Sequence, residues 1–216
     1  MALIVVNIGV FFFELGLAPK ESARFIYTYA LVPAVYGNPE LARQAGLEAT
    51  SVLPIVTNTF MHGGYLHLIV NMWTLWLFGL PVEDRLGPWR FLLFYLVCGT
   101  AGSVSHLAFN LDSLVPALGA SGAIAGVLGA FSRLHPRARV SVVQPIFFFP
   151  LIFQLPAWVF TAIWFAFQLL PGVAALSAGP ATGGIAWWAH IGGFVVGLTI
   201  ARWIGGRAGP PGPWST

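Results

Sequence analysis

The sequence predicts an all-α membrane protein in which six transmembrane helices form a bundle with both termini in the cytoplasm. The first observation behind this prediction is composition. Of the 216 residues, 57% are hydrophobic and only 8% are charged, whereas a soluble domain has about 25% charged residues. The second observation is that long runs of the chain contain no charged residue. So few charged side chains cannot cover the surface of a soluble protein of this size, so we exclude a soluble fold.

The first three spans come from separate apolar runs, each near the roughly 20 residues that a helix needs to cross a hydrocarbon core. Residues 2–17 contain one charged side chain, Glu14, and no small-residue cleavage site follows them, so we predict a retained span and not a signal peptide. Residues 49–82 contain no Lys, Arg, Asp or Glu, and the second span is placed at 65–80. The third span is predicted at 91–109.

The last three spans are predicted at 117–134, 146–170 and 185–203. No Lys, Arg, Asp or Glu occurs between residues 140 and 201, which is too long a run for one helix. The Pro171-Gly172 pair and the small residues that follow it divide this run into the fifth and sixth spans. All six spans belong to one domain, residues 1–204, and residues 205–216 form a short cytoplasmic tail.

Basic residues orient the bundle, because Lys and Arg accumulate in cytoplasmic loops. Seven of the ten fall on one side of the predicted membrane: Arg85, Arg90, Arg133, Arg137, Arg139, Arg202 and Arg207. Lys20, Arg24 and Arg43 fall on the other side, in the long first loop. This asymmetry places both termini in the cytoplasm and the first loop outside.

Five polar residues lie at the starts of three spans that run from the outer face inward. They are His62, His67 and Asn71 at span two, Ser121 at span four and His190 at span six. Polar side chains inside a bilayer are costly, so each is a functional hypothesis. Because three non-adjacent segments place them at a similar depth, we expect one site near the outer face.

Ser121 and His190 suggest nucleophilic catalysis at this site. A serine hydroxyl needs an adjacent base to attack at neutral pH, and the backbone N–H groups of a helix start can stabilise an oxyanion. Small residues would let the two helices approach closely: Gly122 and Gly126 on span four, and Gly193 and Gly197 on span six. Taken alone, however, a Ser beside Gly in a membrane helix is usually packing material, and a single His is often structural.

Other chemistries have less support. There is no His-Glu-x-x-His motif and no carboxylate near the three histidines, so we predict no metal. Asp84 and Asp112 fall in loops, which disfavours an aspartyl mechanism, and Cys98 is the only cysteine. A transporter would need polar groups that reach the inner half of the spans, whereas the polar groups in this sequence stop near the outer face. Neither a cofactor nor nucleic-acid binding is predicted.

Taken together, these residues resemble the rhomboid family of intramembrane serine proteases. The resemblance runs from the first span to Gly197. Its motifs are His62-x4-His67-x3-Asn71, Val82-Glu83-x-x-Leu86-Gly87, Gly119-x-Ser121-Gly122 and Ala189-His190-x-x-Gly193-x-x-x-Gly197. Each motif is weak alone, and their occurrence in this order on six spans is specific.

The resemblance implies a Ser–His dyad with Ser121 as nucleophile and His190 as general base. It further implies an oxyanion hole formed by His67, Asn71 and the Ser121 N–H, with His62 in support, and packing at the dyad by Gly119 and the four glycines named above. In some relatives, an aromatic residue one helical turn after the serine stacks on the histidine. Because Ala125 stands there, His190 must be held differently, for which contacts at Gly122 and Gly126 are one candidate.

The expected activity is cleavage of peptide bonds in or beside transmembrane segments of single-span or multi-span membrane-protein substrates within the bilayer. The alternative is a catalytically inactive rhomboid-like protein that binds membrane clients. The basic cytoplasmic loops and the lack of a targeting extension predict the plasma (inner) membrane of a prokaryote, with the site near the outer face; an organelle membrane is the alternative left open. The sequence does not fix the oligomeric state.

Overall fold

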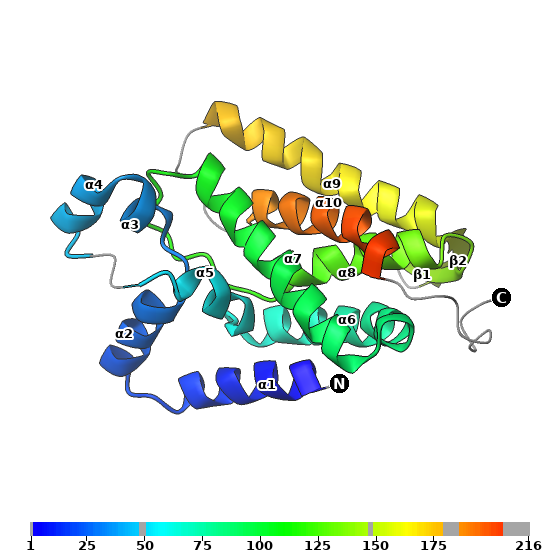
Figure 1. Ribbon diagram of the computed structural model, residues 1–216, viewed down its shortest axis with the longest axis horizontal. Helices are drawn as coiled ribbons and strands as arrows, with labels where there is room; N and C mark the ends of the chain where they lie inside the picture. The colour runs from blue at the N-terminus through cyan, green and yellow to red at the C-terminus, as the bar shows by residue number, and fades with distance from the viewer. Residues whose placement is uncertain (1, 48–50, 147–148, 179–185, 205–216) are drawn as a thin grey trace.

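The computed structural model describes residues 2–47, 51–146, 149–178 and 186–204, and this part of the chain is mostly helical (Figure 1). The long helices are α1 (Ala2–Leu15), α6 (Tyr65–Leu86), α7 (Pro88–Phe109), α8 (Ser121–Leu134), α9 (Ala157–Ala178) and α10 (Trp187–Ile204). The first loop forms α2 (Pro19–Tyr29), α3 (Pro33–Gly37), α4 (Pro39–Gln44), α5 (Pro54–Thr57) and the 3₁₀ helix η1 (Asn58–Phe60). Residue 185 and the predicted tail, 205–216, lie outside the described residues.

A helix occurs at each of the six predicted spans, but their lengths differ. Within the described ranges, three helices are long and apolar enough to cross a membrane: Tyr65–Leu86, Pro88–Phe109 and Ala157–Ala175. Helices α1 and α8 are apolar but shorter. The count of six spans and the cytoplasmic placement of the termini stay predictions.

Helix α8 lies at the centre of the bundle. It has 14 residues, and every residue from Gly122 to Phe131 is buried. Helices α6, α7, α9 and α10 all pack against it. A helix that is enclosed by its neighbours does not have to match the bilayer thickness, because protein and not lipid surrounds its ends. At 1.5 Å per residue α8 is about 21 Å long, shorter than the hydrocarbon core.

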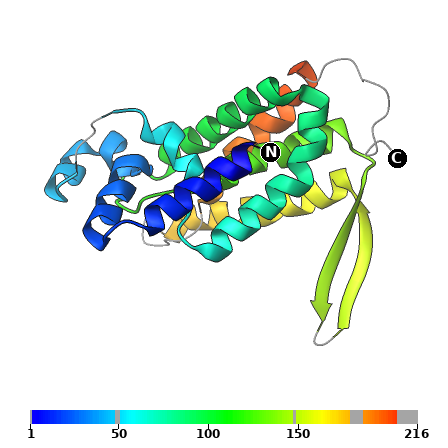
Figure 2. The ribbon, with the colours of Figure 1, turned by 90° about the horizontal axis from the view of Figure 1, so that it is seen from below.

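Residues 139–156 correct the prediction of an all-α chain. They contain a β-hairpin in which β1 (Arg139–Ile146) pairs antiparallel with β2 (Phe149–Pro156), so the fifth helix begins at Ala157 and not at 146. The hairpin projects away from the bundle (Figure 2). Three prolines, at 145, 150 and 156, disfavour a helix here, and the β-branched and aromatic residues between them favour strands.

Other helix boundaries also differ from the prediction. Helix α6 continues to Leu86, six residues past the predicted end of the second span. Helix α9 continues through Pro171 to Ala178, because a proline in a membrane helix is tolerated when the freed carbonyl finds other partners. Helix α8 begins at Ser121, four residues later than predicted. Gly119 has φ of +139°, which a helix does not allow, and Ala117 pairs with Leu31 of the first loop.

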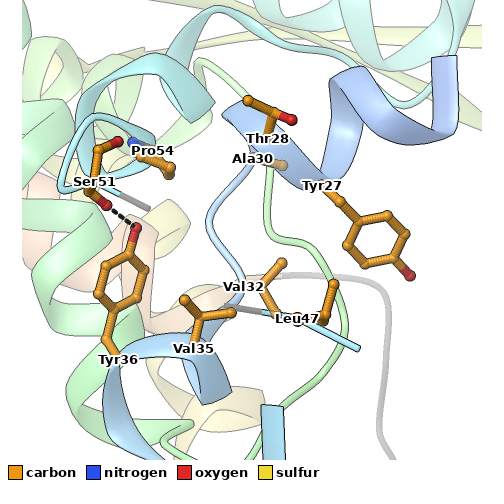
Figure 3. A pocket seen from close by; sticks show the side chains of 9 residues that line it. All are labelled: Tyr27, Thr28, Ala30, Val32, Val35, Tyr36, Leu47, Ser51 and Pro54. Atoms are coloured by element: carbon orange, nitrogen blue, oxygen red, sulfur yellow. Dashed lines mark hydrogen bonds between the residues drawn. The ribbon is translucent and has the colours of Figure 1, made fainter. Parts of the chain in front are cut away.

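The first loop packs at one end of the bundle, opposite the hairpin (Figures 1 and 2). It encloses a small cavity between α2, α3 and the start of α5 (Figure 3), where the Tyr36 hydroxyl donates to the Ser51 carbonyl oxygen at 3.0 Å. The cavity measures about 30 Å³, which is room for about one water molecule. It is therefore too small to be a site for a protein substrate.

Candidate active site

The segment that leads into α8 is held by the first loop. Leu31 and Ala117 exchange two backbone hydrogen bonds, of 2.9 and 2.7 Å, and the Gly119 N–H donates to the Asn58 carbonyl oxygen at 2.9 Å. The Asn58 side chain in turn donates to the Ser103 hydroxyl of α7. These bonds fix the chain just before Ser121, so the position of the first residue of α8 is set by contacts from two other segments.

Ser121 and His190 are brought together across the bundle. The Ser121 Oγ lies 2.8 Å from the His190 Nε2, within the range of an O–H···N hydrogen bond. Ser121 is the first residue of α8, and His190 lies in the first turn of α10. The N–H groups at the start of α8 have no partner within the helix, so they are donors beside the serine hydroxyl.

Close packing of α8 on α10 makes this distance possible. A Cβ atom on Gly193 would overlap the carbonyl oxygen of Gly122, and one on Gly197 would overlap that of Gly126. The four glycines therefore lie where the two backbones touch. Without side chains between them, the helices approach closely enough for residues at their starts to form a hydrogen bond.

His67 lies beside the same serine. A Cβ atom built on Gly119 would be 2.9 Å from His67 Nε2 and 3.5 Å from Ser121 Oγ, so the histidine ring occupies the space that a side chain at 119 would need. The positive φ of Gly119 also favours glycine at this position. Gly119 thus allows the imidazole of α6 to reach the start of α8.

Asn71 and His62 supply buried polar atoms near His67. The Asn71 side chain is 6% exposed, and its Nδ2 has no hydrogen-bond partner among the residues that the structure describes. The His62 ring, 2% exposed, lies 5.2 Å from the His67 ring between centroids, and neither of its nitrogens has a partner in that part of the chain. Burial, with a smaller contribution from the neighbouring His67, lowers the pKa of His62 to about 4. The His62 imidazole is therefore neutral at pH 7.

A cavity of about 600 Å³ joins these side chains. It is lined by residues from α6, from the segment before α8, and from the starts of α8 and α10: Gly63, His67, Val70, Asn71, Pro116, Ala117, Leu118, Ser121, Ala186 and His190. Four of the five sequence-predicted polar residues thus face one space, and His62 lies behind it, next to His67. Across the described ranges, no group of three or more His, Cys, Asp and Glu side chains is placed to hold a metal ion.

One residue of the site is missing from the sequence prediction. Gln168 of α9 lies with its Oε1 2.7 Å from the His190 Nδ1. The signal was present, because an amide in an otherwise apolar span is costly unless it is hydrogen-bonded. Gly122 and Gly126 are the suggested supports of His190. The Gly122 position faces the Ala189 carbonyl of α10, and the Gly126 position faces the Cys98 side chain of α7 and the Gly193 carbonyl of α10.

Comparison with known families matches a Rhomboid domain to residues 49–207. The chain belongs to the rhomboid family. It is 34% identical to the mitochondrial Rhomboid protein 1 of Saccharomyces cerevisiae over 209 residues, which cover 94% of this chain and 52% of the yeast protein. Shorter matches include the mitochondrial Presenilin-associated rhomboid-like protein A of Danio rerio, 36% identical over 44% of this chain and 25% of that protein. A third relative is the Rhomboid protease GluP of Bacillus subtilis, 45% identical over 35% of this chain and 14% of that protein.

These comparisons correct the prediction of a prokaryotic plasma membrane. The yeast relative, which matches most of the rhomboid chain, and the zebrafish relative are both mitochondrial. They point to a eukaryotic mitochondrial membrane instead. The chain spans about half the length of the yeast relative.

Proposed function

We propose that this rhomboid chain is an intramembrane serine endopeptidase that cleaves peptide bonds in or beside transmembrane segments of other membrane proteins. The observation that carries the proposal is the 2.8 Å contact between Ser121 Oγ and His190 Nε2, at the wall of a cavity that also exposes His67 and Asn71. A hydroxyl next to an imidazole, with hydrogen-bond donors facing the same space, is the arrangement that acyl transfer requires. Family membership and the relative named as a protease support the same chemistry.

The reaction begins with attack of the Ser121 Oγ on the scissile carbonyl carbon. His190 Nε2 takes the hydroxyl proton as the new C–O bond forms, and the carbonyl oxygen becomes an oxyanion. The imidazolium then gives this proton to the leaving amine nitrogen, the C–N bond breaks, and an acyl-enzyme remains. A water molecule, deprotonated by the same imidazole, hydrolyses the ester and restores the serine.

The oxyanion would be stabilised by three donors: the Ser121 backbone N–H, His67 Nε2 and Asn71 Nδ2. Support comes from the position of His67 beside Ser121 and from the buried Asn71 Nδ2, which has no hydrogen-bond partner among the described residues. A buried amide nitrogen without a hydrogen bond costs free energy, and a role in the transition state explains that cost. His62 supports the ring of His67 from behind.

The depth of the site suits a substrate held in the bilayer. With the inner end of α8 at the cytoplasmic interface, a helix of about 21 Å does not cross the roughly 30 Å hydrocarbon core. Ser121, its first residue, would then lie below the outer membrane surface, at the end where the first loop packs. The cavity that reaches it gives water a route to the acyl-enzyme. A six-span bundle embedded in lipid would present this site to a neighbouring transmembrane segment.

A serine-reactive fluorophosphonate distinguishes the protease from an inactive rhomboid that binds clients. We expect the wild-type protein, reconstituted in detergent micelles, to be labelled covalently and Ser121→Ala to remain unlabelled, because only a serine activated by a base reacts. The measurement is in-gel fluorescence after a timed exposure. Ser132→Ala, on the same helix, is the matched control and should be labelled like the wild type. Equal labelling of Ser121→Ala, or none of the wild type, would favour the client-binding protein.

Asn71 provides a separate test of the oxyanion hole. Replacement of Asn71 by alanine is expected to lower kcat about 100-fold with little change in KM, since removal of one oxyanion donor weakens only the transition state. The measurement is the rate of cleavage of a fluorescent single-span substrate as its mole fraction in the membrane varies. Asn110→Ala is the control, because the Asn110 amide is engaged with the His106 carbonyl oxygen. A rise in KM at constant kcat would assign Asn71 to substrate binding instead.

A further inference from the structure

Gln168 is a polar side chain that hydrogen-bonds the His190 ring from α9, a helix outside the predicted site. Its Oε1 lies 2.7 Å from Nδ1, on the opposite side of the imidazole from Ser121. The residue comes from α9, and it is separated from His190 by 22 positions in the sequence. The chain Ser121–His190–Gln168 therefore joins α8, α10 and α9 through two hydrogen bonds.

The chemistry of the amide oxygen fixes the direction of both bonds. A carbonyl oxygen can only accept a hydrogen bond, so Nδ1 must donate and carry the proton. In a neutral imidazole the other nitrogen, Nε2, then has the free lone pair. Nε2 is the atom that faces the Ser121 hydroxyl. The contact with Gln168 thus selects the tautomer in which His190 can take the serine proton.

The surroundings of the ring leave this role to Gln168. The residue one turn after the serine is Ala125, which is fully buried and presents no ring. The rings of Trp164 and Trp187 lie with their centroids 6.1 and 6.4 Å from that of His190; they limit its rotation, but neither interaction selects a tautomer. Trp164 precedes Gln168 by one helical turn, so the same face of α9 provides both the packing and the hydrogen bond.

We infer that Gln168 is a positioning residue for the general base: its amide oxygen accepts from His190 Nδ1, orients the imidazole and holds the proton away from Nε2. The inference rests on the proposed protease function. It adds a third, uncharged member to the dyad. A carboxylate in the same place would also stabilise the imidazolium, as in soluble triads. A neutral amide supplies the orientation without burying a negative charge in the membrane, which is the more costly alternative.

Two substitutions at this position separate orientation from packing. Gln168→Leu has nearly the same size and no acceptor, and we expect it to lower kcat about tenfold or more with KM unchanged, because one hydrogen bond to the base is lost. Gln168→Glu keeps an acceptor oxygen. It should retain more activity than Gln168→Leu, and its loss of activity on acidification should begin at a higher pH than in the wild type, because the carboxylate favours the protonated ring. The same Gln-to-Leu change at Gln154, in the projecting hairpin, is the matched control.

Nitrogen-15 NMR of histidine-labelled protein in micelles tests the inference without any substrate. With the His190 signals assigned by their absence from His190→Ala, the wild type should show the proton on Nδ1, and Gln168→Leu should lose this preference. A proton found on Nε2 in the wild type would mean that the Gln168 amide donates to Nδ1, and would overturn the inference.

The kinetic outcomes distinguish this inference from the proposed function. If Ser121→Ala is inactive while Gln168→Leu and Gln154→Leu both cleave like the wild type, Gln168 has no positioning role and the protease proposal stands. If Gln168→Leu and Gln168→Glu are equally impaired with unchanged pH profiles, the residue serves only to pack α9, and the inference is again wrong. If the wild type does not cleave and NMR still finds the Nδ1 proton lost in Gln168→Leu, the contact is as inferred and the proposed function fails.

Discussion

Replacement of Ser121 by alanine is expected to abolish cleavage of a labelled single-span substrate in proteoliposomes, with a fall in kcat of at least about 1,000-fold. Loss of the nucleophile removes the acyl-enzyme route altogether, and in soluble serine proteases this is among the most costly single changes. What remains is the slow attack of water assisted by the oxyanion donors. The measurement is the appearance of the cleaved fragment on a gel as a function of time, at equal amounts of folded protein.

His190→Ala should be almost as inactive as Ser121→Ala, and the double variant should be no worse than either alone. Residues that act as a unit give strongly non-additive losses, because removal of either one disables the same step. Wild-type activity should also fall at low pH, since only the neutral imidazole can accept the serine proton. Ser132→Ala on α8 and His106→Ala on α7 are the controls, and both should retain activity. Substantial cleavage by His190→Ala would contradict the mechanism.

The predicted polar residues were recoverable from the sequence because a bilayer makes polar side chains costly. A soluble domain of the same length would contain dozens of Ser, His and Asn residues in ordinary surface positions. Here His67, Asn71, Ser121 and His190 stood out against apolar runs, and all four line one cavity. Gln168 does not stand out in this way, because an uncharged amide does not interrupt a charge-free run.

The β-hairpin is the opposite case, because its sequence is apolar like that of the spans but its structure is not helical. Hydrophobicity alone does not distinguish a membrane helix from a pair of apolar strands. The length of the charge-free run 140–201 and its small residues predict two spans, but they do not show that its first part forms strands. The prolines at 145, 150 and 156 carried the missing information. The late start of α8 could not be predicted in the same way, because it depends on the pairing of Ala117 with Leu31, 86 positions earlier in the chain.

Substitution of Gly197 by alanine is also expected to have a large effect, and it acts far from the reacting atoms. The added methyl would overlap the carbonyl oxygen of Gly126, on the central helix. The obstacle is backbone and not the end of a flexible side chain, so the two helices must separate. Overpacking of this kind costs about 1–3 kcal/mol of stability. We expect a lower midpoint of thermal unfolding, followed by circular dichroism in detergent micelles.

The catalytic consequence should exceed the loss of stability. His190 lies two turns before Gly197 on α10, and Ser121 lies five residues before Gly126 on α8, so separation at the glycine contact lengthens the 2.8 Å bond between Nε2 and Oγ. A displacement of about 1 Å in a catalytic group can lower a rate about 100-fold. Cleavage by the folded fraction of Gly197→Ala should therefore fall by about that factor. Gly9→Ala on α1 is the matched control, because a Cβ there meets nothing within 4 Å. If Gly197→Ala cleaved and unfolded like Gly9→Ala, close approach of α8 and α10 would not be what holds the serine and the histidine together.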